Sequence, residues 1–177
     1  IASSKSVVDF GIGVNVEEDL INKSWFDTIP SAFWKLYPYG ISSEQYFSYA
    51  KEVLGKTKKP LVIHCEHPDH MHNEPLTKLS DHTQNRLVAE PECLASMPSS
   101  PYLHVAHLST LEGLNQMPES ATSEVCPHHL LLNLDNCNSL DCKVDPPLRT
   151  TADNSGLYNA FRKGKIPILS SDHAPHT

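Results

Sequence analysis

The chain has 177 residues and carries 14 Lys and Arg against 21 Asp and Glu, a formal net charge of −7 at pH 7. This balance argues against a nucleic-acid partner, because phosphate contacts need clustered basic side chains and the one dense basic run is Lys56, Lys58 and Lys59. No stretch approaches the roughly 20 consecutive apolar residues of a membrane helix, so no membrane partner is expected either. Hydrophobic residues make up 39% of the chain, enough for about one packed soluble domain.

Cysteine and histidine carry further information. The five cysteines form an odd set without a Cys-x-x-Cys pair, which indicates neither a disulfide framework nor a thiolate zinc knuckle. We therefore expect a reducing compartment, the cytoplasm. Histidine is unusually frequent, with eleven residues, and several of them stand at the ends of apolar runs. That placement is the first indication of a metal-binding or catalytic function.

Six short segments rich in apolar and β-branched residues are predicted to be strands. Most are near-continuous apolar runs, which is typical of strands buried on both faces of a parallel sheet. Helices are predicted between them at residues 42–55 and 152–164, each ending at a glycine. The alternation favours repeated βα units, either a (β/α)8 barrel or an open doubly wound sheet. The predicted strands are residues 6–14, 32–37, 60–65, 102–108, 122–127 and 166–171.

Metal-capable side chains end three of these runs, namely His64, His107 and Asp172. A single histidine at a strand end is more often a hydrogen-bonded core or loop residue than a ligand. Three such residues on separate strands favour a metal site, because the carboxyl ends of barrel strands converge on one face. Imidazole and carboxylate together suit zinc or a similar divalent ion.

Five motifs, in this order and spacing, resemble those of dihydroorotases of the cyclic-amidohydrolase superfamily. The most specific are Asp-His-Ala-Pro-His at 172–176 and Pro-Pro-Leu-Arg at 146–149, where the related hydantoinases and allantoinases usually differ. The resemblance covers nearly the whole chain. The five motifs are PLVIHCE at 60–66, HVAHLST at 104–110, SEVCPHHL at 123–130, KVDPPLR at 143–149 and SDHAPHT at 171–177.

The resemblance implies an α/β fold, a (β/α)8 barrel of which the six strands correspond to strands three to eight. Residues 1–177 are then a partial metal-dependent hydrolase barrel domain, without the first two strands and the C-terminal part. The family's first strand carries a His-x-His pair that binds the more buried metal, and no such pair precedes Lys35. The only His-x-His, His70 and His72, belongs with His67 to the loop after His64, which we interpret as solvated and capable of adventitious metal binding only.

The resemblance also implies a site with two zinc ions. His64 and His107 would hold the more exposed ion, a carboxylated Lys35 would bridge the two, and Asp172 would bind the buried ion and act as the catalytic proton shuttle. An exposed lysine near a turn is the alternative for Lys35. Its aromatic and apolar neighbours favour the carbamate, since a bare ammonium there would be costly.

Four further residues are assigned by the same resemblance. His176 is similar to the histidine that contacts the substrate carboxylate. Asp145 stands at a substrate-binding position where relatives usually have Asn or Arg, and an ionised Asp cannot donate a hydrogen bond. It could be protonated, turned away, or salt-bridged to Lys143 or Arg149. Glu124 and His129 are additional ligand candidates, although hydrogen bonding behind the ligands or simple packing is favoured for His129 and its neighbour His128.

The predicted function is that of a zinc-dependent dihydroorotase, which interconverts N-carbamoyl-L-aspartate and L-dihydroorotate in de novo pyrimidine biosynthesis. The small-molecule substrate is the expected partner, in a homodimer. The first alternative is a hydantoinase or allantoinase. The second is a non-catalytic dihydroorotase-like subunit that scaffolds aspartate transcarbamoylase, and the missing His-x-His favours it. That absence also argues against activity of these 177 residues alone.

Overall fold

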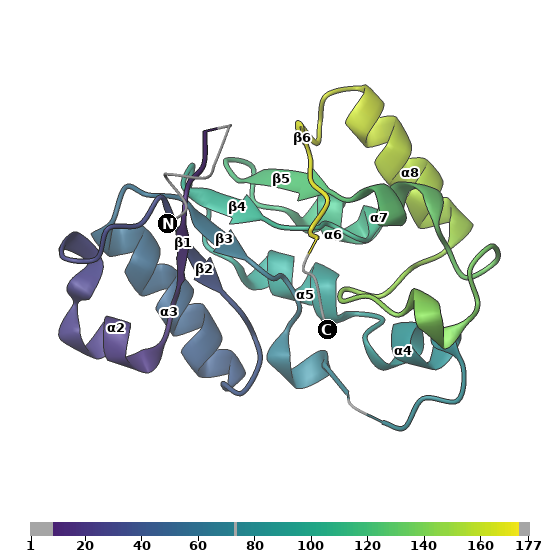
Figure 1. The fold of residues 1–177 in the computed structure, drawn as a ribbon, viewed down its shortest axis with the longest axis horizontal. Coiled ribbons are helices and arrows are strands. Elements are labelled where there is room, and N and C mark those ends of the chain that lie inside the picture. Colours follow the sequence, from purple (N-terminus) through teal and green to yellow (C-terminus); the bar gives the residue numbers. More distant parts are fainter. Residues whose placement is uncertain (1–8, 73, 174–177) are drawn as a thin grey trace.

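The computed structural model describes residues 9–72 and 74–173. Six strands in this part of the chain form one parallel sheet, in which neighbours in sequence are neighbours in space. Figure 1 shows the strands following one another across the sheet from the N-terminal to the C-terminal end of the chain. The predicted α/β fold of repeated βα units is confirmed. The strands are β1 (Gly13–Asn15), β2 (Phe33–Leu36), β3 (Leu61–Ile63), β4 (Leu103–Val105), β5 (Thr122–Val125) and β6 (Ile168–Leu169).

Five of the six strands lie inside the predicted segments, and the first lies later than predicted. The prediction placed it at residues 6–14, of which residues 6–8 are outside the described part. In the structure β1 begins at Gly13, which pairs with Phe33 of β2. Phe10 and Ile12 precede β1 and are 50% and 60% exposed. The apolar residues that suggested a buried strand here therefore do not belong to one.

Helices follow most strands. Figure 1 places α2 and α3 at the end of the sheet that carries β1, and α7 and α8 at the end that carries β5 and β6. They are α2 (Glu18–Lys23), α3 (Ser43–Lys56), α4 (Leu79–Asn85), α5 (Ala89–Ser96), α6 (Leu111–Gln116), α7 (Pro127–Leu131) and α8 (Thr151–Arg162), with short 3-10 helices η1 (Trp25–Asp27), η2 (Pro68–His70) and η3 (Leu140–Cys142).

The two predicted helices, α3 and α8, both begin with a capping box. The Ser42 hydroxyl accepts a hydrogen bond from the backbone N–H of Gln45, and the Gln45 side chain accepts one from the Ser42 N–H. Thr150 and Asp153 make the same reciprocal pair at α8. The bounds differ slightly from the prediction. Each helix starts one residue away from its predicted start, α3 continues one residue past its glycine, and α8 stops two residues before its own.

The strands divide the molecule into a packed outer side and a hollow inner side. Leu61, Ile63, Leu103 and Val105 belong to the buried core, where α3 contacts β3. The intervening residues point the other way, because side chains alternate along a strand. The inner face therefore carries the polar side chains of the candidate site.

A disulfide joins Cys137 and Cys142 around η3, with the two Cα atoms 6.3 Å apart. The odd number of cysteines indicated no disulfide framework, and that prediction missed this local pair five residues apart. The separation of the Cα atoms is in the range that a disulfide spans. Cys65, Cys93 and Cys126 are free and buried. No helix of the described residues is both long and apolar enough to cross a membrane.

Candidate functional site

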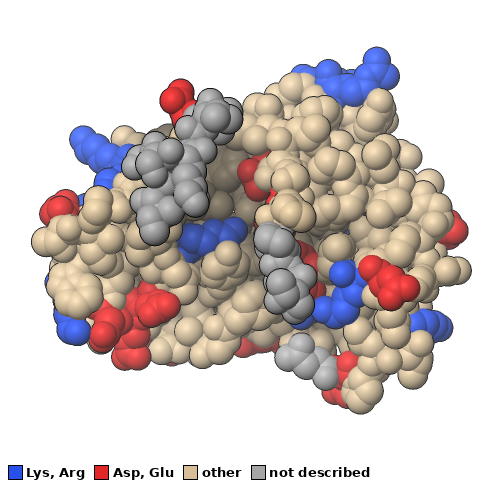
Figure 2. All heavy atoms as spheres, in the orientation of Figure 1, with Lys and Arg blue, Asp and Glu red and all other residues tan. Residues whose placement is uncertain are grey.

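A cavity of about 610 Å³ lies on the inner face of the sheet. Its walls include Lys35 from β2, His104 from β4, Glu124 from β5 and Asp172 after β6. Figure 2 shows a hollow near the middle of this face, with basic and acidic side chains on its walls. The cavity thus collects polar groups from strands that are far apart in the sequence.

Lys35 belongs to β2 and projects into this cavity, so it is not an exposed lysine near a turn. Its Nζ atom lies 5.0 Å from the centre of the Tyr37 ring. Burial lowers the pKa of the Lys35 amine, and the negative charges of Asp172 and Glu124 offset only part of that effect. The lowered pKa favours the neutral amine, the form that reacts with carbon dioxide to give a carbamate.

His64 and His107 follow β3 and β4, and the structure brings them together. Both are buried, and their ring centroids are 4.6 Å apart in an edge-to-face arrangement. His107 has a positive φ of 40°, a left-handed conformation that is uncommon for residues other than glycine. Its Nδ1 atom is buried without a hydrogen-bond partner among the described residues. Burial lowers the pKa of His107 well below its ordinary value, so the ring is a neutral imidazole with a lone pair to offer.

The orientation of His64 is fixed by a buried carboxylate. The Nε2 atom of His64 lies 2.7 Å from Oε2 of Glu66, and Nη1 of Arg86 lies 2.8 Å from the same oxygen. Burial acts to raise the pKa of Glu66, but the hydrogen bond with His64 and the charge of Arg86 outweigh it and leave the pKa lowered. An ionised carboxylate only accepts, so we assign the His64 proton to Nε2. This leaves Nδ1 as the ring nitrogen that could bind an ion.

Asp145 is held by one histidine and two cationic side chains. Its Oδ1 atom lies 2.8 Å from Nε2 of His82, 3.4 Å from Nη1 of Arg86 and 3.7 Å from Nζ of Lys143. Burial acts to raise the pKa of Asp145, but the hydrogen bond from His82 and the charge of Arg86 hold it well below the ordinary value. The side chain is therefore ionised, which removes the protonated alternative and supports the salt bridge to Lys143. Arg149 instead donates to the backbone carbonyl of Arg86.

Asp172 lies on the cavity wall after β6. Like His107, it has a left-handed backbone, with φ of 47°, and it is exposed. Its negative charge acts to raise the pKa of Lys35 and of the Cys126 thiol. His176, the predicted substrate-binding residue, lies outside the described residues.

Glu124 and His129, the additional candidates, lie in different surroundings. Glu124 reaches the cavity from β5, and its Oε2 atom is 3.4 Å from Nε2 of His104. His129 is buried in α7, and its Nε2 atom donates to the Pro146 carbonyl at 3.1 Å. The interpretation favoured from the sequence was packing or a hydrogen bond, and this agrees with the surroundings of Nε2. It does not account for the buried Nδ1 atom of the same ring.

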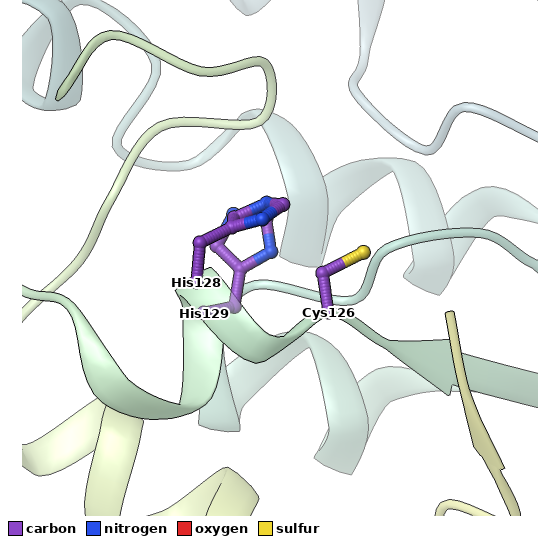
Figure 3. Close-up of side chains that lie close together, drawn as sticks. All are labelled: Cys126, His128 and His129. Carbon is purple, nitrogen blue, oxygen red and sulfur yellow. The ribbon is translucent and has the colours of Figure 1, made fainter. Parts of the chain in front are cut away.

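The sequence did not reveal three of the residues that shape the site. His82 lies in α4 and Arg86 directly after it, in the long connection between β3 and β4. No hydrophobic periodicity in the sequence indicates either residue. Cys126 was counted only among the five cysteines and within the SEVCPHHL motif. It lies close to His128 and His129, and the three offer ligand atoms within 4.8 Å of one another (Figure 3). The adjacency Cys-Pro-His-His was the available signal.

The donor set fits a divalent cation. Two imidazoles meet at adjacent strand ends, and one of them, His107, has a buried nitrogen without a hydrogen-bond partner among the described residues. An amine and a carboxylate line the neighbouring cavity. Nitrogen and oxygen donors of this kind suit zinc and related ions.

Known proteins resemble this chain in sequence and in structure. A dihydroorotase of Pyrobaculum aerophilum is 30% identical over 149 residues, which covers 81% of this chain and 37% of the relative. A dihydroorotase of Halobacterium salinarum is 27% identical over an alignment of 194 residues, which covers 99% of this chain and 46% of that protein. The chain thus spans less than half the length of these relatives. No family model matches the chain.

Solved structures show the same fold at lower identity. A D-hydantoinase from a Bacillus species superposes with a TM-score of 0.75 at 18% identity, covering 98% of this chain and 45% of that one. A dihydroorotase from Saccharomyces cerevisiae, solved with 5-fluoroorotic acid, gives 0.64 at 17% identity and covers 93% of this chain and 52% of that one. The six parallel strands are part of a (β/α)8 barrel. Together with the sequence likeness to dihydroorotases, this shows that the chain belongs to the cyclic-amidohydrolase superfamily.

Proposed function

We propose that this chain forms the larger part of the catalytic barrel of a dihydroorotase, which opens the ring of L-dihydroorotate and closes N-carbamoyl-L-aspartate. The observation that carries the proposal is the contact between His64 and His107, buried at adjacent strand ends with a ring nitrogen of His107 unpartnered among the described residues. The likeness to dihydroorotases over most of the chain supports the choice of substrate.

We assign two zinc ions to the site. His64, through Nδ1, and His107 would hold one ion, Asp172 the other, and Lys35 would bridge them as a carbamate. When bound, such ions supply Lewis acidity, which lowers the pKa of water and polarises a ring carbonyl. Carbamate formation joins the neutral Lys35 amine to the carbon of carbon dioxide with loss of one proton, and burial of the amine favours it.

Asp172 would move the proton. Its carboxylate would accept a proton from the attacking water and deliver it to the ring nitrogen as the amide bond breaks. Exposure of Asp172 on the cavity wall suits this role, because an acid-base group must reach both solvent and substrate.

Glu66 and Arg86 would act through His64. The carboxylate fixes the His64 ring and its tautomer, and Arg86 holds that carboxylate in place. Carboxylates hydrogen-bonded to a ligating histidine orient the ring and raise its basicity. Both residues are buried, so the arrangement is rigid before any ion binds.

The substrate would be held by groups of opposite character. His176 would contact its carboxylate, as the resemblance implies. Asp145 is ionised and paired with Arg86, so any contact with substrate must be as an acceptor, for example from a ring N–H. A homodimer, a place in pyrimidine biosynthesis and a cytoplasmic location belong to the same proposal.

A hydantoinase is the second candidate, because D-hydantoinases superpose well on this chain, with TM-scores of 0.75 and 0.64. It would keep the metal ligands and change the substrate pocket. A non-catalytic subunit that scaffolds aspartate transcarbamoylase is the third candidate. It gives no physical reason why a buried His107 nitrogen, beside the buried His64, should have no hydrogen-bond partner among the described residues.

The test is a substrate comparison on the natural full-length protein loaded with zinc. Ring opening of L-dihydroorotate, hydantoin and allantoin is measured alongside closure of N-carbamoyl-L-aspartate. We expect the highest kcat/KM with dihydroorotate and measurable closure. Activity confined to hydantoin or allantoin would support the second candidate. Absence of both zinc binding and activity would support the third.

A further inference from the structure

A cluster of three potential ligands lies beside the cavity, on the segment that links β5 to α7. Cys126 precedes the helix, and His128 and His129 belong to its first turn. Their ligand atoms lie within 4.8 Å of one another. Figure 3 shows the two imidazole rings close together, with the Cys126 side chain next to them. None of the three residues belongs to the proposed centre of Lys35, His64, His107 and Asp172.

His129 has the hydrogen-bonding pattern of a metal ligand. Its Nε2 atom donates to the Pro146 carbonyl at 3.1 Å, so Nδ1 carries the lone pair. That Nδ1 atom is buried and has no hydrogen-bond partner among the described residues. An unsatisfied buried polar atom is costly and calls for an explanation. Ligating histidines characteristically donate their other N–H to a carbonyl or carboxylate, as His129 does.

His128 and Cys126 supply the remaining donors. The His128 ring centroid is 4.3 Å from that of His129, and burial lowers the pKa of His128, which favours the neutral ligand form. His128 is only half-buried, which gives an ion a route from solvent. The Cys126 sulfur is a soft donor, and burial raises the pKa of this thiol to about 12, so without an ion it stays protonated.

We propose that Cys126, His128 and His129 form a separate binding site for one thiophilic divalent cation of the zinc and cadmium class. On binding, the Cys126 S–H bond breaks, a sulfur–metal bond forms and the proton goes to solvent. Donors of a tetrahedral zinc ion lie about 3.5 Å apart, so small side-chain rotations bring the three atoms into range. Water or a further side chain would complete the coordination. The inference is independent of the proposed function.

The experiment is a titration of the metal-free protein with Co²⁺, without thiol reductant so that Cys137 and Cys142 stay paired. Thiolate coordination gives an intense sulfur-to-cobalt charge-transfer absorption, which ligands with only nitrogen and oxygen donors do not give. The proposed centre therefore contributes nothing to this signal. We expect the band to grow to the intensity of one thiolate-bound Co²⁺ per chain, whatever further Co²⁺ the proposed centre takes up, and to vanish when Cd²⁺ or Zn²⁺ is added in excess.

Two pairs of variants locate the site. Cys126→Ala should abolish the band, whereas Cys93→Ala, which removes another free buried thiol, should keep it. His128→Gln should weaken Co²⁺ binding at least tenfold, about 1.4 kcal/mol, whereas the exposed His72→Gln should not. If Cys126→Ala fails to fold, as circular dichroism would report, the half-buried His128 decides. A wild-type protein without the band, a band that survives Cys126→Ala, or unchanged affinity in His128→Gln would overturn the proposal.

Discussion

At the centre of the sheet, His64 and His107 follow strands that have hydrogen-bonded neighbours on both sides, whereas Asp172 follows β6, whose one neighbour among the described residues is β5. The central residues are buried, and a charged network holds one of them. Asp172 is exposed, and the two residues of β6 before it are 42% and 53% exposed. The comparison teaches that the candidate site joins a rigid ligand pair to a loosely supported carboxylate.

The largest effect on activity is expected at the exposed Asp172. Asp172→Ala should lower kcat for ring opening by about 10²–10⁴-fold, because it removes the proposed proton shuttle. The melting temperature of the metal-free protein should hardly change, because the side chain is exposed. Asp27→Ala, another exposed aspartate, serves as the control and should leave kcat unchanged. A full-strength Asp172→Ala enzyme would remove Asp172 from the mechanism.

The largest effect on stability is expected in the buried network of Arg86, Glu66 and His64. Arg86→Met leaves the Glu66 carboxylate buried without its cation, and removing one partner of a buried pair costs about 3–5 kcal/mol. Urea unfolding measures the loss. Lys23→Met, in the exposed pair with Asp19, should cost less than about 1 kcal/mol. Equal losses in the two variants would show that the network around Arg86 is no more rigid than the surface.

A smaller effect, on zinc affinity, should show whether Glu66 orients the His64 ring for metal binding. Glu66→Gln keeps the shape of the side chain but removes its charge, so zinc affinity should fall about 10–100-fold. Competition with a chelator measures the affinity directly. Glu112→Gln on exposed α6 is the matched control. Unchanged zinc affinity in Glu66→Gln would mean that the carboxylate does not orient a ligand.

The smallest expected effect concerns pH. Because the pKa of folded Asp145 lies well below its ordinary value, the unfolded chain takes up a proton at higher pH than the folded chain. The stabilisation is therefore complete above the unfolded pKa of about 3.9 and is lost as pH falls through the folded pKa. Asp145→Asn should be less stable than wild type at pH 7, and the difference in melting temperature should shrink towards about pH 3. A constant difference would contradict the ion pairs described for Asp145.

Much of the barrel could be predicted from the sequence because its strands are short apolar runs set between helix-forming stretches. The expected burial on both faces is wrong for β2, β3 and β4, in which fully buried residues alternate with partly exposed ones on the cavity side. The contact between His64 and His107 followed from two histidines at the ends of successive strands. Arg86 could not be predicted in this way. It reaches Glu66 because of how α4 packs within the connection between β3 and β4, and neither residue pattern nor spacing encodes that packing.

The remaining differences also have physical causes. Ile12 is as apolar as a strand residue, yet it stands before β1 and is exposed. The disulfide between Cys137 and Cys142 depends on a turn of η3, which composition does not show. The proximity of Cys126, His128 and His129 could not be predicted, because it depends on α7 starting at Pro127, directly after Cys126.

The left-handed backbone at His107 and Asp172 has a consequence for protein engineering. A residue other than glycine held at positive φ costs of the order of 1 kcal/mol or more, so under the proposed function these two positions lose folding stability in order to place a ligand side chain. At the exposed position, Asp172→Gly should relax this strain and raise the melting temperature while it abolishes activity. A search that selects stabilised variants by melting temperature alone would therefore accept this substitution, although the variant is expected to be inactive.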